Sequence, residues 1–117
     1  MKLPECKYKQ TQMDLATLKD KPDVGFEDHG VFVMFGTFDY GYACQGLGYC
    51  VDHKFIQKFI RAFGVSKLSE CDGAIFVEHT NGLGIARLIP LGIHHGEEFD
   101  IAKFTKNKRF ELKKKDG

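Results

Sequence analysis

Cysteine and histidine are the residues of this 117-residue chain that could hold a metal. Cys44, Cys50 and His53 fall within ten residues of one another. Structural zinc sites usually use two cysteine pairs, with partners about two to four residues apart. The wider spacing here favours small apolar cysteines and an exposed histidine, so we expect no metal and no cofactor. A fourth ligand would have to come from His79, His94 or His95.

The same residue types could perform nucleophilic catalysis, in which a histidine takes the proton of a thiol. Cys44 or Cys50 would be the nucleophile, and His53, His79 or His94 the base. Glu78 precedes His79, but neighbours on a strand point to opposite faces, so Glu78 is poorly placed to orient that ring. We therefore predict no catalytic residues and a protein that is not an enzyme.

A glycine-rich stretch, Gly41 to Cys50, precedes a helix that Asp52 would cap, and helix starts can hold phosphate. The third glycine of a dinucleotide fingerprint is missing, because position 51 is valine. The Asp52 carboxylate would also repel an anion. The stretch therefore predicts a tight glycine-rich connection rather than a nucleotide site.

Tyrosines are concentrated around the same connection, next to lysines on the helix that follows. Aromatic rings beside cations can stack on single-stranded nucleic acid, and they are also enriched in protein interfaces. Residues 1–100 carry ten Lys or Arg and fourteen acids, a net charge of −4 that disfavours nucleic acid. We therefore predict a protein-binding surface. Its residues are Tyr40, Tyr42, Gln45, Tyr49, Lys54 and Lys58.

The elements that would position this surface can be read from periodicity. Residues 31–40 are apolar on both faces of a strand. The next element is a helix after Asp52, ending at Gly64. Residues 1–24 predict a short helix or an edge strand. A turn is expected over residues 19–23, which contain Pro22. The buried face of the helix would be Phe55, Ile56, Phe59, Ile60 and Phe63.

A β-hairpin is predicted after the helix, from residues 74–79 and 83–91. Asn81-Gly82 favours a two-residue type I′ turn, which would place Val77 near Ala86 and Ile75 near Leu88. The apolar residues Phe99, Ile101 and Phe104 would anchor a final short strand or helix.

These elements predict an α+β fold: a small antiparallel sheet of about four strands packed against one main amphipathic helix, with a C-terminal β-hairpin. Residues 1–105 would form the domain. Residues 106–117 would be a basic tail, because residues 101–117 carry seven Lys or Arg and two acids, a net charge of +5. Few apolar residues could dock that tail, so we expect it to be poorly ordered or a frayed helix.

Residues 25–92 resemble a group of small, uncharacterised phage and prophage proteins. The resemblance rests on Gly25-Phe26-Glu27-Asp28-His29-Gly30 before the strand, Gln45-Gly46-Leu47-Gly48-Tyr49 after it, a Phe-rich helix and a hairpin. It implies a phage or prophage origin and a role in the cytoplasm of the bacterial host. The absence of an apolar N-terminal stretch or a membrane-length apolar run agrees with that location.

We therefore predict a non-enzymatic phage protein that binds a host bacterial protein, such as an anti-CRISPR-like inhibitor of bacterial defence. A homodimer through a sheet edge or the helix would use the same kind of surface. The alternative is a nucleic-acid-binding accessory protein of phage replication. No interaction with a membrane is expected.

Overall fold

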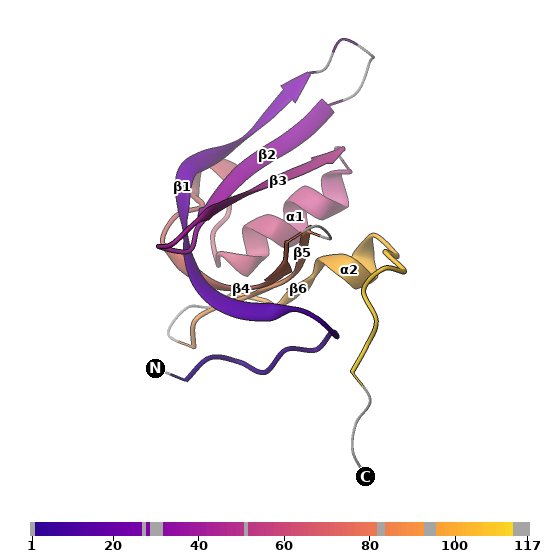
Figure 1. The fold of residues 1–117 in the computed structure, drawn as a ribbon. Coiled ribbons are helices and arrows are strands. Elements are labelled where there is room, and N and C mark those ends of the chain that lie inside the picture. The colour runs from indigo at the N-terminus through magenta and orange to yellow at the C-terminus, as the bar shows by residue number, and fades with distance from the viewer. Residues whose placement is uncertain are drawn as a thin grey trace.

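Six strands of the described chain form one antiparallel sheet in the order β3-β2-β1-β4-β5-β6. This computed structural model describes residues 2–26, 28, 32–50, 52–81, 84–92 and 96–113, with Tyr49 and Cys50 described by their backbone alone. The sheet curves so that the helix α1 lies inside the bend (Figure 1). The strands are β1 (Gln12–Phe26), β2 (Phe32–Asp39), β3 (Cys44–Cys50), β4 (Ala74–Thr80), β5 (Gly84–Ile89) and β6 (Phe99–Asp100); the helices are α1 (His53–Ala62), the 3₁₀ turn η1 (Leu68–Glu70) and α2 (Ile101–Phe104).

The prediction of about four strands packed on one main helix is wrong, because the described fold is mostly sheet. The glycine-rich residues predicted as a connection instead form the edge strand β3, paired with β2 from Val33–Cys50 to Asp39–Cys44. Glycine weakens a strand but does not prevent one. The expected short element near Phe99 is both a strand and a helix, since β6 leads directly into α2.

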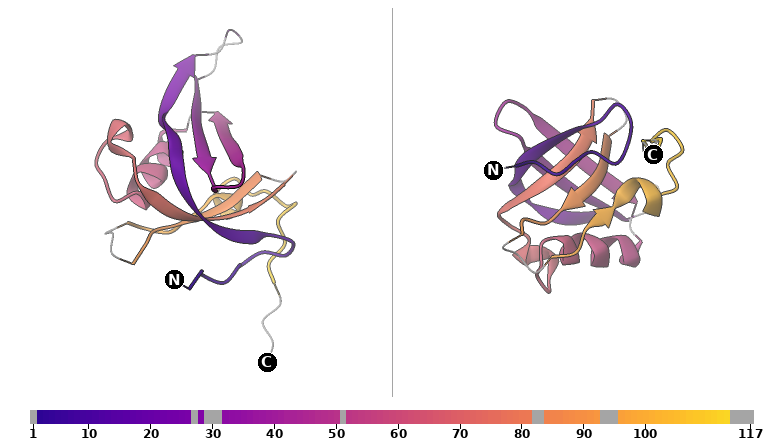
Figure 2. Two further views of the ribbon diagram at one scale, coloured as in Figure 1. Left: turned by 60° about the vertical axis from the view of Figure 1, so that its left-hand side comes forward. Right: turned by 90° about the horizontal axis from the view of Figure 1, so that it is seen from below.

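The strand β1 is the largest departure from the sequence prediction. Instead of a turn at residues 19–23, the chain continues as one strand of 15 residues in the middle of the sheet. Its first half pairs with β4 and its second half with β2, as Figure 2 shows from two further sides. The β1–β2 register shifts between Leu18 and Asp23. Such bulges accommodate a proline, which cannot donate to the ladder, and they bend the strand.

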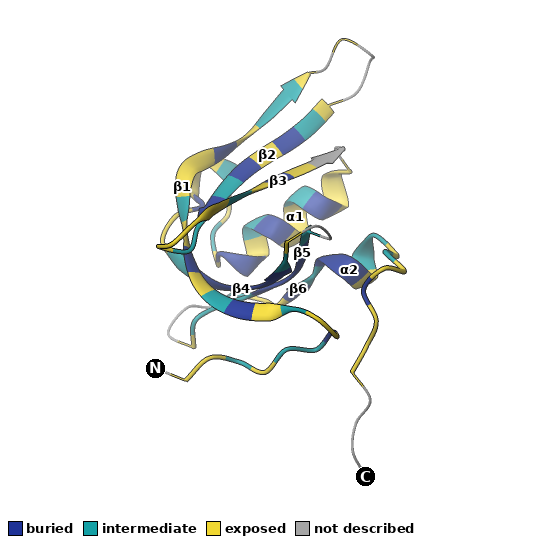
Figure 3. Ribbon diagram, in the orientation of Figure 1, coloured by how far each residue is buried: buried dark blue, intermediate teal, exposed yellow. Residues whose placement is uncertain are grey.

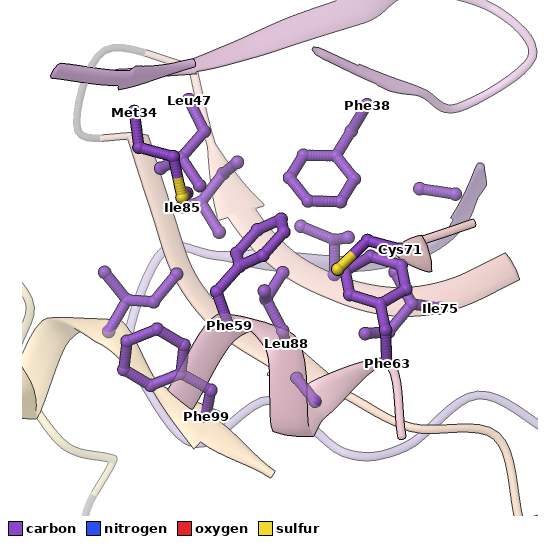
Figure 4. Close-up of a cluster of buried hydrophobic side chains, with 14 of the residues drawn as sticks. Met34, Phe38, Leu47, Phe59, Phe63, Cys71, Ile75, Ile85, Leu88 and Phe99 are labelled. Carbon is purple, nitrogen blue, oxygen red and sulfur yellow. The ribbon is translucent and has the colours of Figure 1, made fainter. Parts of the chain in front are cut away.

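The helix α1 packs on the concave side of the sheet. Of its predicted buried face, Phe55, Phe59 and Phe63 are buried, whereas Ile56 and Ile60 are half-buried. Asp52 caps it by accepting a hydrogen bond from the backbone N–H of Lys54 at 2.8 Å. Phe55 and Phe59 are completely buried, and the outward face is exposed (Figure 3). These side chains pack among residues from both halves of the sheet, including Met34, Phe38, Leu47, Ile75, Ile85, Leu88 and Phe99 (Figure 4).

The predicted β4–β5 hairpin is present, but its register differs from the prediction by one residue at the turn and by two residues beyond the register shift between Glu78 and His79. Val77 pairs with Leu88, and Thr80 pairs with Gly84, which leaves three residues in the turn rather than two. Gly84 has a φ of +96°, a conformation that glycine adopts without strain. The second residue of the predicted turn, Gly82, lies outside the described residues.

A buried carboxylate anchors the N-terminal segment to the convex face of the sheet. Glu78 in β4 is fully buried, and its oxygens accept hydrogen bonds from the backbone N–H groups of Lys7 (3.1 Å) and Tyr8 (2.9 Å). Thr11 Oγ1 donates to the same carboxylate at 2.6 Å, and Arg87 Nε from β5 does so at 2.5 Å. The two oxygens of the Glu78 carboxylate therefore accept four hydrogen bonds, which offset the cost of burying its charge.

The C-terminal segment is docked as far as Lys113, which corrects the expectation of a frayed end from Lys106 onward. Phe110 is buried against Tyr8, with ring centroids 5.7 Å apart. Leu112 forms an isolated antiparallel bridge with Tyr8, and the backbone N–H of Lys113 donates to the carbonyl of Lys7 at 3.0 Å. Residues 114–117 lie outside the description, so the rest of the lysine run has no structural account.

Both helices end in the same backbone motif, but with different residues at the left-handed position. After α1 this position is Gly64, with a φ of +69°; after α2 it is Lys106, with a φ of +54°. The N–H of Lys106 donates to the carbonyl of Lys103, and the N–H of Asn107 to that of Ala102, which is the Schellman pattern. A side chain strains this conformation, so Lys106 lowers the stability of the turn relative to glycine.

We expect Lys106→Gly to stabilise the protein by about 1 kcal/mol, because relief of the left-handed strain outweighs the extra freedom of the unfolded chain. Urea unfolding monitored by circular dichroism would measure the change. Lys108→Gly, in a neighbouring exposed turn without positive φ, is the matched control and should destabilise slightly. Equal effects of the two substitutions would contradict this explanation.

Candidate functional site

A pocket of about 260 Å³ lies where the β2–β3 turn approaches the start of β1 and the end of β4. The turn spans residues 40–43, between the purple strands at the left of Figure 1. Tyr40 and Tyr42 line the pocket from this turn, together with Gln12 of β1 and His79 of β4. The other lining residues are Ala43, Cys44, Gln45 and Asn81.

A network of hydrogen bonds centred on Asp14 fixes the polar groups of the pocket. Asp14 Oδ2 accepts from Tyr42 OH at 2.6 Å and from Gln12 Nε2 at 2.8 Å. His79 Nε2 lies 2.7 Å from the same oxygen, and the Gln12 amide also donates to the Tyr42 hydroxyl at 2.6 Å. An ionised carboxylate can only accept, so His79 carries a proton on Nε2.

Tyr40 supports this network from within. Its ring stacks on His79, with centroids 4.1 Å apart and planes 9° from parallel, and the ring of Tyr42 stacks 6.0 Å away at 29°. Its hydroxyl donates to Gln45 Oε1 at 2.5 Å, and Gln45 donates in turn to the carbonyl of Thr80 at 3.4 Å. Burial raises the pKa of Tyr40 above its ordinary range, with a smaller contribution from Asp14, so this hydroxyl stays protonated.

The carboxylate of Asp14 remains ionised in this setting. Burial alone raises the pKa of Asp14, but the hydrogen bonds from Tyr42, Gln12 and His79 together outweigh burial and bring the pKa below its ordinary value. Tyr42 responds in the opposite direction: its hydrogen bond to Asp14 raises the pKa of the phenol. The site at neutral pH is therefore one carboxylate surrounded by donors.

Acid should destabilise the protein through its three well-bonded carboxylates, Asp14, Glu78 and Asp100. In each, burial raises the pKa, and the hydrogen bonds that the carboxylate accepts lower it by more. A lowered folded-state pKa contributes stability that is present above the unfolded pKa and is lost as the pH falls through the folded value. We expect the urea concentration at the unfolding midpoint to decrease as the pH is lowered from about 5 to about 2. A midpoint that stays constant over this range would contradict the assigned bonds.

The residues predicted as a binding surface divide into two groups. Tyr40, Tyr42 and Gln45 meet at the pocket, with Tyr42 65% exposed and the other two partly buried. Lys54 and Lys58 lie on the exposed outward face of α1 and do not line the pocket. The backbone of Tyr49 pairs with Met34, and its side chain lies outside the description.

The residues considered for metal binding and catalysis are only partly described. Cys44 and His79 line the same pocket, but Nε2 of His79 contacts Asp14. His53 is exposed on α1. No three His, Cys, Asp or Glu side chains in the described ranges are grouped to hold a metal ion. Cys6, Cys44 and Cys71 are free thiols, and burial raises the pKa of Cys71 to about 11. His94, His95 and the Cys50 side chain lie outside the description.

The sequence analysis did not identify Asp14 or Gln12 as site residues. It considered His79 as a ligand or a base, but not as the partner of Asp14. Glu78 does point away from His79, as alternation along a strand requires, and it belongs to the convex-face network instead. Asp14 reaches His79 because β1 pairs with β4, with Gln12 opposite His79. Because the sequence predicted only a short helix or an edge strand here, and not a long interior strand paired with β4, the polar residues at the start of β1 gave no usable signal.

Comparison of the chain with protein-family models, with curated proteins and with solved structures found no match. The resemblance to small phage proteins therefore stays a prediction from the sequence, and part of its first motif (Glu27, His29 and Gly30) lies outside the described residues. The described part of the chain contains no helix long and apolar enough to cross a membrane.

Proposed function

We propose that this chain is a non-enzymatic binding protein that recognises another protein through the pocket at the β2–β3 turn. Tyr42 is its central anchor, and Tyr40 and Gln45 hold the pocket in shape. The proposed partner is a protein of the bacterial host, met in the host cytoplasm. That part of the proposal, and inhibition of a defence system as its purpose, rest on the sequence resemblance alone.

One observation carries the proposal: Tyr42 is highly exposed and yet held by hydrogen bonds. The residue is 65% exposed, whereas its hydroxyl is bonded to Asp14 and Gln12, both at 2.6 Å. Exposed tyrosines ordinarily sample several rotamers, and a partner must then offset the entropy of fixing them. A tyrosine already fixed beside a pocket has the properties of an interface hot spot, with a large apolar face and a polar end.

Recovery of the partner with wild-type and variant protein tests this proposal. The tagged protein would be used to isolate a partner from a bacterial lysate at moderate salt after nuclease treatment, and the purified partner would be titrated by calorimetry. We expect Tyr42→Ala to weaken binding by about 2 kcal/mol, or about 30-fold, as truncated hot spots do. Tyr42→Phe should lose less binding affinity, because it keeps the ring and removes only the hydroxyl that bonds to Asp14.

Phe32→Ala is the matched control, since it removes another exposed ring, 54% exposed, from a different part of the sheet. It should leave the affinity unchanged. Equal losses for Tyr42→Ala and Phe32→Ala would exclude the pocket as the interface. Retention that disappears with nuclease and with salt would instead support the nucleic-acid-binding alternative.

A further inference from the structure

A second surface, independent of the tyrosine pocket, surrounds the turn after α2. A hollow of about 530 Å³ lies here, and lysines and apolar side chains line it together. Lys103, Lys106 and Lys108 supply the charge, while Phe110 and Leu112 supply much of the apolar wall. A neighbouring hollow of about 420 Å³ shares Asn107 and Phe110 with the first, and its lining includes Arg109.

The charges of this surface are unbalanced. Lys7 also lines the first hollow, but it is paired with Asp100 at 2.6 Å. Lys103, Lys106, Lys108 and Arg109 form no ion pair with another described residue. No acidic residue is among those that line either hollow. Three cations that no described carboxylate neutralises thus line an apolar recess, and a fourth, Arg109, lines the neighbouring hollow.

Lys106 gives this surface a second distinguishing feature. It occupies the left-handed position after α2 with a φ of +54°, where the corresponding residue after α1 is glycine. Strain of this kind is commonly found where a side chain has a function. The strained turn places Lys106 in the lining of the hollow, together with Lys103 and Lys108.

We infer that this surface binds an acidic, amphipathic segment of a partner protein. Carboxylates of the segment would meet the four cations, and an apolar side chain would enter the recess beside Leu112, which is 59% exposed. Nucleic acid fits less well, because bases need free aromatic faces for stacking. The rings here, Tyr8 and Phe110, are 4% and 7% exposed and pack on each other.

The neighbouring hollow extends the path of such a segment to the edge of the sheet. Gly46 and Gly48 of β3 line it, and in the described chain β3 pairs with β2 alone. A strand edge with glycines presents its backbone without side chains in the way, so an extended segment could continue along it.

Fluorescence anisotropy with the full chain tests the inference. The probe is a labelled synthetic peptide in which glutamates flank one leucine and one phenylalanine, and labelled oligothymidylate is measured beside it. We expect the peptide to bind, with weaker binding at higher salt. Lys106→Glu combined with Lys108→Glu should lower its affinity by about tenfold or more. Lys54→Glu combined with Lys58→Glu makes the same charge change on α1 and should lower it less than about twofold.

A further variant separates lost binding from lost folding. Lys106→Gly removes one cation and also relieves the strained turn, so it should bind the peptide more weakly while melting at a higher temperature. Equal losses in the two lysine pairs would overturn the inference, since only net charge would then matter. Absence of saturable peptide binding would overturn it as well. Tighter binding of oligothymidylate that depends on the same lysines would assign the surface to nucleic acid instead.

Discussion

Glu78→Ala should be the most destabilising single substitution on the convex face, at about 3–5 kcal/mol. The carboxylate is fully buried, and it accepts hydrogen bonds from two backbone N–H groups, the Thr11 hydroxyl and Arg87. Alanine would leave Arg87 as a buried cation without its partner in β4 and would remove the acceptor for the segment at Lys7 and Tyr8. The free energy of unfolding of a small domain is about 5–15 kcal/mol in total, so a large fraction of the variant protein could be unfolded.

Urea unfolding of Glu78→Ala would be compared with that of Glu98→Ala. Glu98 also bonds to Arg87, but its side chain is 48% exposed, so its loss should cost less than about 1 kcal/mol. Replacing the pair, Glu78→Leu with Arg87→Met, should restore part of the stability lost in Glu78→Ala, because no buried charge is then left unpaired. Equal destabilisation by Glu78→Ala and Glu98→Ala would show that the buried carboxylate does not hold the N-terminal segment.

The elements that the sequence predicted correctly have local signals that agree with their surroundings. The helix α1 has a capping aspartate, an apolar stripe at helical spacing and Gly64 after its end. The interior strand β2 is apolar on both faces, but only the face that carries Met34 and Phe38 is buried, and Phe32 and Phe35 are exposed. At the buried positions of both elements the residues that favour the element also face the core, so local and tertiary preferences coincide there.

The strands β1 and β3 were missed because their tertiary setting overrides their local signals. Residues 19–21 and 23 of β1 are exposed and charged, and Pro22 among them is typical of a turn. Pro22 is nonetheless buried, and a Cβ added to Gly36 in β2 would lie 3.8 Å from it. Without β1, the contact of Asp14 with His79, 65 residues apart, could not be foreseen.

The candidate pocket was predictable only to the extent that it is local. Tyr40, Tyr42 and Gln45 lie within six residues, and a single turn brings them together. The Asp14 network depends on the pairing of β1 with β4, and the convex-face network depends on contacts of Lys7, Tyr8 and Thr11 with Glu78, which is distant in the sequence. The tail was misjudged for a related reason: Phe110 is an isolated aromatic in a basic sequence, and its partner Tyr8 is supplied by the other end of the chain.

Phe59→Ala should destabilise the protein by about 3–5 kcal/mol, because it leaves a cavity in the middle of the core. The side chain is completely buried, 6.5 Å from Phe38 and 5.2 Å from Phe63 between ring centroids. It therefore links α1 to the β2 half of the sheet and to the end of its own helix. Phe59→Leu should cost less, since it refills part of the volume.

Gln57→Ala is the control for the helix itself, because Gln57 is exposed on α1 and alanine is a good helix former. It should change the free energy of unfolding by less than about 0.5 kcal/mol. Thermal and urea unfolding of both variants would measure the contrast between the two faces of one helix. If Phe59→Ala melted with the wild type and Gln57→Ala did not, α1 would face the sheet with its other side, and the curved sheet would lack the core described here.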